Sequence, residues 1–249
     1  MRSVCLLARS FATVGLLAAA ASGHAAVSST WTLASDYDFR GITQTAQEPA
    51  LQASLDFAAD GGWYIGGWAS NTDFCASGAA CLDADHEIDL YSGFTGTVGE
   101  HGPAWDVGLV YYSYEESAYD YPEIYASLGK DGYKAKLFYS NDFGGDTTHG
   151  NTSAFYFDGS AAVPLPENFS LLAHVGYSFG DYWDDLHAAG TGGKYFDYSV
   201  GVGYAIGNFN LAVRWIDGSD LKESDGTRGD VFSSEARVVL SIATTFPWK

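Results

Sequence analysis

The stretch that decides the fold is YFDYSVGVGYAIGNFNLAVRWID, residues 195–217. Apolar residues at even positions from 196 to 202 alternate with Asp197 and Ser199, and those at odd positions from 211 to 215 alternate with Asn210 and Arg214. Alternation with a period of two is typical of a strand that has one apolar and one polar face. The tight Gly-Asn connection between the two halves is typical of a β-hairpin. The stretch therefore predicts two antiparallel strands.

The same alternation recurs from residue 29 to residue 246, and we find no convincing apolar stripe of helical period beside it. It predicts twelve strands, at residues 29–40, 49–58, 62–71, 86–97, 104–114, 121–129, 133–142, 152–163, 168–180, 194–206, 208–217 and 232–246. Most of them have about 9–13 residues, close to the length that a tilted strand needs to cross a bilayer.

The connections between these strands alternate in length. The tight ones follow the even-numbered strands, at residues 59–61, 98–103, 130–132, 164–168 and 206–208. The longer, polar ones follow the odd-numbered strands, at residues 41–48, 72–85, 115–120, 143–151, 181–193 and 218–231. Short turns on one rim and long loops on the other are typical of outer-membrane barrels. We therefore predict an all-β, transmembrane, antiparallel up-and-down β-barrel of about twelve strands, with periplasmic turns, extracellular loops and both termini in the periplasm.

The main alternative is an ordinary half-buried sheet in a water-soluble protein. Against it, charged residues avoid the apolar parity in the strands at 29–40, 86–97, 133–142 and 232–246, as expected where a charge facing lipid costs about 2–4 kcal/mol. Aromatic residues near strand ends also fit the girdles that mark membrane interfaces. They are Trp31, Trp63, Trp105, Tyr133, Phe169, Tyr195, Phe209, Phe246 and Trp248.

Composition narrows the function. The 249 residues include 31 acidic and 12 basic side chains, and the formal net charge is −19. Such a charge repels phosphate backbones, which argues against nucleic-acid binding. With 47% hydrophobic and only 17% charged residues, the chain is neither disordered nor collagen-like.

Residues 1–25 have the pattern of a secretory signal peptide. Arg2 and Arg9 form a positively charged segment that precedes an apolar stretch of about eleven residues. Small residues precede the expected cleavage site after Ala25. A membrane-anchoring helix is the alternative, but the stretch is shorter than the ~20 residues that a span requires. We expect an exported chain whose residues 26–249 form a single barrel domain.

Two cysteines, Cys75 and Cys81, lie in the mature region within one Gly/Ala-rich segment. In an exported protein such a close pair predicts a disulfide that closes one loop. A metal or redox pair is the alternative, although the spacing is not C-x-x-C and His86 stands alone nearby.

Several of these strands together resemble the TorF porin family, of the Gcw_chp type of conserved proteobacterial proteins. The resemblance is most specific in DYDFRGI, residues 36–42. It extends over residues 35–45, 50–57, 62–71, 87–94, 105–114, 121–128 and 236–246, which is nearly the whole mature chain. The loop from Cys75 to Cys81 and the ending at residues 247–249 lie outside the pattern. The resemblance implies an outer-membrane porin and carries over no functional residues.

Strand parity selects fifteen charged residues that we expect to line the barrel lumen. They are Asp36, Asp38, Arg40, Asp56, Glu87, Asp89, Asp106, Glu123, Lys134, Lys136, Asp158, Asp197, Arg214, Glu235 and Arg237. Charges of both signs keep a passage wet, and the acidic excess favours cations and small polar solutes. We therefore predict a porin-like channel for passive diffusion of small hydrophilic solutes. A lumen that these residues plug by pairing with one another is the alternative, because twelve strands lie between filled and open barrels.

Two further functions are open. An outer-membrane enzyme could use an acid/His cluster at His86, His149 or His187, but we find no nucleophile motif and predict no catalysis, cofactor or metal centre. The acidic loops could instead serve surface interactions. The expected partners are outer-membrane lipid, lipopolysaccharide, small solutes and, during biogenesis, the barrel-assembly machinery; the sequence leaves the oligomeric state open.

Overall fold

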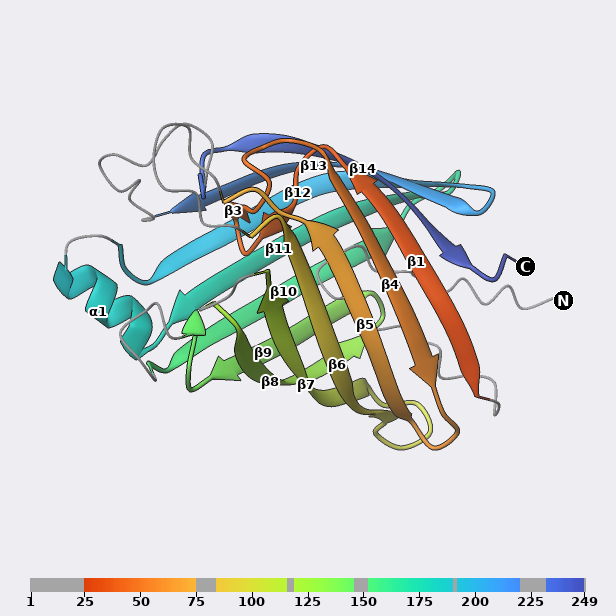
Figure 1. Ribbon diagram of the computed structural model, residues 1–249. Coiled ribbons are helices and arrows are strands. Elements are labelled where there is room, and N and C mark those ends of the chain that lie inside the picture. Colours follow the sequence, from red (N-terminus) through yellow and green to blue (C-terminus); the bar gives the residue numbers. More distant parts are fainter. Residues whose placement is uncertain are drawn as a thin grey trace, which may run out of the picture.

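The computed structural model describes residues 25–74, 84–115, 119–145, 152–189, 192–219 and 232–248. Among these residues, twelve strands close an antiparallel barrel in which β1 pairs with both β14 and β4 (Figure 1). The barrel strands are β1 Ala26–Ala34, β4 Ala50–Ala58, β5 Trp63–Asn71, β6 His86–Thr97, β7 Ala104–Tyr114, β8 Tyr121–Lys130, β9 Tyr133–Ser140, β10 Ala154–Pro164, β11 Phe169–Phe179, β12 Tyr195–Ile206, β13 Phe209–Ser219 and β14 Arg237–Phe246. The predicted fold class is confirmed.

The chain ends close the ring. Ser29 of β1 lies opposite Phe246 of β14, and the ladder continues to Ala34 opposite Ser241. On its other side, β1 pairs with β4 along its whole length. A closed ring leaves no unpaired strand edge, so the backbone amides and carbonyls of the wall are satisfied sideways.

The two rims differ as predicted. The connections β4–β5, β6–β7, β8–β9, β10–β11 and β12–β13 lie on one rim, and each spans two to six residues. In the β8–β9 turn, Asp131 and Gly132 both have positive φ, which is the backbone geometry of a two-residue type I′ hairpin. On the opposite rim the β7–β8 connection has six residues and every other connection is longer; these connections carry β2 (Asp38–Phe39), β3 (Ile42–Thr43) and helix α1 (Asp181–Ala189).

The two faces of the wall have opposite chemistry. The outward positions hold large apolar side chains, among them Leu55, which is 62% exposed, Leu240, which is 53% exposed, and Val213, which is 50% exposed. The inward positions hold buried carboxylates such as Glu87 and Glu123, each no more than 1% exposed. This arrangement inverts that of a water-soluble protein and follows the period-two pattern of the sequence.

Tyrosines fill much of the inner face on the β5–β10 side. Tyr64, Tyr91, Tyr112, Tyr125 and Tyr156 belong to one buried cluster. Glycines on adjacent strands make room for these rings: a methyl group added at Gly93 would lie 2.3 Å from Tyr64 Oη, and one at Gly66 would lie 2.5 Å from the ring of Tyr91. The rings therefore lie close against the wall.

Three predictions of local structure are wrong. The strand predicted at 29–40 ends at Ala34, because the chain then leaves the wall and folds into the lumen. The strand predicted at 232–246 begins only at Arg237. The loop predicted at 181–193 contains α1, in which Trp183 is the one buried residue; a nine-residue helix with so little apolar surface gives no readable period.

Helix α1 covers the long-loop end of β10 and β11 (Figure 1). Trp183 of α1 packs in a buried cluster with Ala154 and Tyr195. Asp184 of α1 forms an ion pair with Lys194, which follows the helix in the chain. No helix in the described residues is long and apolar enough to span a bilayer.

The expected interfacial aromatic residues divide into two groups. Trp63, Tyr133, Phe169, Phe209, Phe246 and Trp248 are exposed and lie at or next to strand ends. Trp31 is exposed in the middle of β1, and Trp105, the second residue of β7, is partly exposed. Tyr195 is instead only 1% exposed and faces the interior, so its assignment to a girdle was wrong. Tyr37 and Phe39 share the parity of Trp31 and Leu33, which predicts the apolar face for them, but they lie in the segment that folds inward.

We predict that a cation on the outer face destabilises the barrel in lipid. Val213→Lys places a charge within the apolar belt and should lower the free energy of unfolding in vesicles by about 2–4 kcal/mol. Arg214→Lys, at the neighbouring inward position, should change it far less. Denaturant titration of both refolded variants measures this, and equal losses would contradict the assignment of faces.

Candidate functional site

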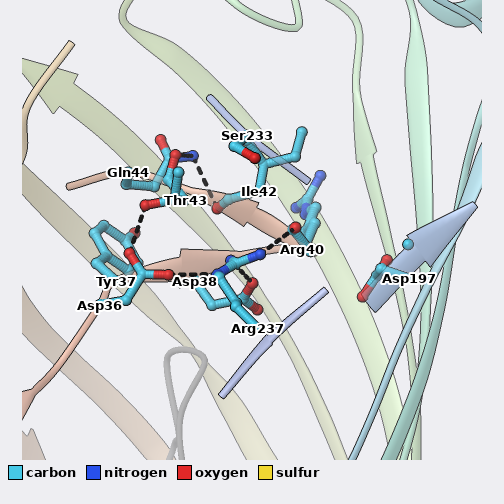
Figure 2. Close-up of polar contacts among 12 residues, drawn as sticks. Asp36, Tyr37, Asp38, Arg40, Ile42, Thr43, Gln44, Asp197, Ser233 and Arg237 are labelled. Atoms are coloured by element: carbon cyan, nitrogen blue, oxygen red, sulfur yellow. Dashed lines mark hydrogen bonds and ion pairs between the residues drawn. The ribbon is translucent and has the colours of Figure 1, made fainter. Parts of the chain in front are cut away.

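A hairpin inside the barrel is the main feature of the lumen. After Ala34 the chain runs inward as residues 35–48, which we call the inward hairpin, and returns to the wall at Ala50. Its two short strands, β2 and β3, pair Asp38 with Thr43 and Phe39 with Ile42 (Figure 2). The DYDFRGI stretch, the most specific part of the family resemblance, is therefore this hairpin and not wall.

The tip of the hairpin is a tight turn. Arg40 and Gly41 have φ values of 54° and 84°, the pattern of a type I′ turn. Gly41 is required for a second reason, because a methyl group there would lie 2.6 Å from Cβ of Asp197 on β12. The hairpin tip thus lies directly against the far wall (Figure 2).

Side-chain hydrogen bonds hold the hairpin in this shape. Thr45 Oγ1 accepts from the backbone N–H of Tyr37 at 3.0 Å, and Thr43 Oγ1 donates to Asp36 Oδ1 at 2.5 Å. The backbone N–H of Thr43 donates to the carbonyl of Ser233, just before β14, at 3.0 Å. The short polar residues of this segment therefore replace the backbone pairs that a wall strand would make.

Arg237 of β14 provides the first anchor of the hairpin to the wall. Its Nε lies 2.5 Å from Asp36 Oδ2, its Nη2 donates to Asp38, and its Nη1 donates to the carbonyl of Gly41 at 3.0 Å (Figure 2). Arg237 and Asp36 are both nearly fully buried. The planar guanidinium fixes the directions of its donors toward two carboxylates and a carbonyl, whereas a lysine would offer one compact charge on a flexible stem.

Arg40 provides the second anchor, in the opposite direction. Its Nη2 lies 2.5 Å from Glu123 Oε2 of β8, and its guanidinium lies 4.3 Å from the ring centre of Tyr156 and 5.0 Å from that of Phe138. Burial alone would lower the pKa of Arg40, but Glu123, Tyr112 and Tyr121 together raise this pKa well above its ordinary value, so the group stays charged. Its own carbonyl accepts from Tyr195 Oη at 3.0 Å.

Tyr37 provides a third contact. Its phenol donates to Glu87 Oε1 of β6 at 3.1 Å, and its ring meets Trp68 of β5 edge-on at 5.3 Å. Burial, and then the negative charge of Glu87, raise the pKa of this phenol well above its ordinary value. Tyr37 therefore remains a hydrogen-bond donor to the carboxylate.

Elsewhere in the lumen, carboxylates accept hydrogen bonds from phenols and lie beside one histidine. Both ring nitrogens of His174 face carboxylates, Nδ1 at 3.1 Å from Asp158 and Nε2 at 2.7 Å from Asp197. Tyr64 donates to Asp106 at 2.6 Å. The ammonium group of Lys136 lies 3.5 Å from the ring centre of Tyr125, a cation–π contact.

The structure places most of the predicted lumen residues on inward-facing wall positions. These are Asp56, Glu87, Asp89, Asp106, Glu123, Lys134, Lys136, Asp158, Asp197, Arg214 and Arg237. Asp36, Asp38 and Arg40 also lie inside the barrel, but on the hairpin, which corrects the strand given to them. Glu235 is exposed and precedes β14, because the chain there still turns, with the Glu235 N–H donating to Ser233 Oγ at 3.1 Å. Cys75 and Cys81 lie outside the described residues.

The wall charges are divided between two halves of the barrel. In β4 to β8 the inward charged residues are all acidic: Asp56, Glu87, Asp89, Asp106 and Glu123. In β9 to β14 the inward residues include the cationic Lys134, Lys136, Arg214 and Arg237, besides His174, Asp158 and Asp197. An acidic half therefore faces a mainly basic half.

The rim histidines do not form an evident catalytic centre. His86 is exposed and lies 3.2 Å from Glu115, His187 is on α1, and His149 falls outside the described residues. In the part of the chain that the structure describes, no group of three or more His, Cys, Asp and Glu residues is placed to hold a metal ion.

Sequence reasoning missed the polar partners of the charged residues. Tyr64, Tyr156 and His174 occupy the same parity as the inward carboxylates, so the alternation alone could have placed them in the lumen. The lumen prediction listed only the charged residues of that parity, so these three partners of the carboxylates were left out. A tyrosine serves both faces of such a wall, because its ring is apolar and its hydroxyl is a donor.

One protein family covers the mature chain. Residues 18–246 match the family described as "Bacterial protein of unknown function (Gcw_chp)". The chain belongs to the Gcw_chp family. This confirms that part of the expected resemblance, while the TorF assignment stays a prediction. No curated protein matches this Gcw_chp chain.

Solved structures with a similar fold include two porins. The KdgM porin, in complex with disordered oligogalacturonate, is 7% identical, with a TM-score of 0.52 over 88% of this chain and 98% of that one. The NanC porin is 10% identical, with a TM-score of 0.52 over the same shares. At these identities the likeness shows the fold alone, and it agrees with the closed antiparallel barrel.

For this Gcw_chp protein we predict that loss of the Arg237 anchor is strongly destabilising. Arg237→Gln leaves Asp36 and Asp38 without their cation and should lower the free energy of unfolding by about 3–5 kcal/mol. Lys194→Gln removes the cation of the exposed Lys194–Asp184 pair and should cost less than about 1 kcal/mol. Urea titration followed by tryptophan fluorescence compares them, and similar losses would refute the anchor.

Proposed function

We propose that this protein is a porin-like channel of the bacterial outer membrane for passive diffusion of small hydrophilic solutes. In this proposal the barrel spans the membrane, with the short turns and both termini in the periplasm and the long loops outside. Its partners are outer-membrane lipid and lipopolysaccharide, the barrel-assembly machinery during biogenesis, and the solutes. No enzymatic step, cofactor or metal centre is part of it.

The observation that carries the proposal is the inverted arrangement of the wall. A belt of exposed Leu, Val, Ile and aromatic side chains surrounds the barrel, and charged side chains face the lumen. In water the belt would be a large exposed apolar surface, whereas in a bilayer it contacts hydrocarbon. Placing charged side chains inside a barrel costs desolvation free energy, which a purely structural barrel could avoid with an apolar interior. A lumen that conducts hydrophilic solutes requires such polar side chains.

The division of charge supports a preference among solutes. Five carboxylates on β4 to β8 face the cationic side chains of β9 to β14, so a field crosses the lumen. The acidic excess favours neutral and cationic solutes. A polyanion such as the oligogalacturonate bound by KdgM is a poor match to this lumen, so the fold likeness does not extend to that ligand.

The inward hairpin sets the constriction. It is anchored by Arg237 to one side of the wall and by Arg40 to the other, so it crosses the lumen near the rim of the long loops. We infer that solutes pass beside it. The alternative of a plugged barrel with a surface role rests on the same hairpin, and conductance separates the two.

We predict single-channel steps with a cation preference in planar bilayers. In a KCl gradient, Asp56→Asn should shift the reversal potential toward anions, and Lys134→Gln should shift it toward cations, because each removes one lumen charge. Both side chains face inward and are half-buried. An absence of steps would contradict the channel, and an anion preference of the unaltered protein would contradict the role of the acidic half.

We also predict that removing the hairpin enlarges the conductance. Ala34 and Ala50 are direct neighbours in the β1–β4 ladder, so a short Gly-Ser turn can replace residues 36–48 without straining the wall. The conductance of this variant should rise several-fold. Shortening the turn at residues 98–103, on the other rim, is the control and should leave it unchanged. An unaltered conductance without the hairpin would contradict the hairpin as the constriction of the lumen.

A further inference from the structure

Two buried carboxylates beside the inward hairpin have no cation paired with them in the part of the chain that the structure describes. Glu87 and Asp89 are successive inward residues of β6, and they are 0% and 1% exposed. Glu87 Oε2 and both carboxylate oxygens of Asp89 have no hydrogen-bond partner among the described residues. Glu87 Oε1 accepts a hydrogen bond from the phenol of Tyr37, which belongs to the inward hairpin.

The neighbouring cations already have other partners. Arg40 lies 2.5 Å from Glu123, Arg237 holds Asp36 and Asp38, and the Lys136 ammonium lies over the ring of Tyr125. Isolated ionised carboxylates are very costly to bury, so the Glu87–Asp89 pair must gain positive charge from a source outside these side chains. That source is a proton or a bound cation.

The number of unsatisfied oxygens distinguishes the two sources. The two carboxyl groups lie within hydrogen-bonding reach of each other, so one shared proton would bridge one oxygen of each. The third unpartnered oxygen would still lack a partner. A hard cation such as Ca²⁺ takes six to eight oxygen ligands, from carboxylates in either mono- or bidentate mode, and would engage all three.

We propose that Glu87 and Asp89 form a binding site for one divalent cation at the contact between β6 and the inward hairpin. The two formal negative charges match a divalent ion. Tyr37 lies against one side of the pair, and Tyr114 and Tyr112 of β7 are the strand neighbours opposite Glu87 and Asp89. The bound cation stiffens the wall where Tyr37 contacts it. The site is independent of conduction and exists in an open or a plugged barrel.

The test is a calcium titration of the full-length mature protein, refolded in detergent without lipopolysaccharide and stripped with a chelator. Isothermal titration calorimetry with CaCl₂ should show one saturable site, and the same additions should raise the thermal unfolding temperature. Glu87→Gln combined with Asp89→Asn should weaken this binding at least about tenfold. Glu235→Gln removes one exposed carboxylate just before β14 and is the control, matched in charge to Asp89→Asn alone; it should bind as the unaltered protein does.

Three results would overturn the proposal. The first is no saturable binding to the unaltered protein. The second is equal binding by the Glu87→Gln/Asp89→Asn variant, which would place calcium on the acidic loops. The third is a barrel that ignores calcium but gains stability as the pH falls, which would assign a shared proton to the pair. If the double variant does not refold, Asp89→Asn alone is titrated, and binding by the unaltered protein is measured in any case.

Discussion

The structure depends on one constraint, that every backbone amide and carbonyl of the wall is satisfied by the strand beside it. The β1–β14 ladder meets this constraint by joining the two ends of the sequence into a ring. Once the ring is closed, alternate side chains have only two possible surroundings, and the sequence places the apolar set outside and the charged set in the lumen. The exposed Leu and Val residues and the buried carboxylates follow from the same closure.

Closure also creates a lumen whose charges need partners. Arg40 of the inward hairpin pairs with Glu123 of the wall, and Arg237 of the wall pairs with Asp36 and Asp38 of the hairpin. Hairpin and wall therefore neutralise charges on each other. Such buried pairs gain little net energy, because desolvation offsets the attraction, but they penalise every other position of the hairpin. We infer that the pairs fix where the hairpin lies more than they stabilise the barrel.

The wall could be predicted from the sequence, because a period of two reports directly which face is apolar. The alternation at residues 196–202 and 211–215 placed β12 and β13 to within two residues at each end. The prediction failed where alternation continued but the surroundings changed. Residues 35–40 still alternate, yet the carboxylates of Asp36 and Asp38 bind Arg237, about two hundred positions later in the chain, and no local pattern contains that partner.

Strand parity also fails to distinguish the lumen carboxylates from one another. Parity identified Glu87, Asp89 and Glu123 as inward residues, but it treated them as equivalent pore charges. In the structure Glu123 pairs with the charge of Arg40 and accepts a hydrogen bond from Tyr112, whereas Asp89 meets no donor among the described residues. The difference arises from where the hairpin tip places one guanidinium. Because that placement follows from the whole hairpin and not from β6, strand patterns can list the charges of a lumen but cannot tell which of them remain available to a ligand.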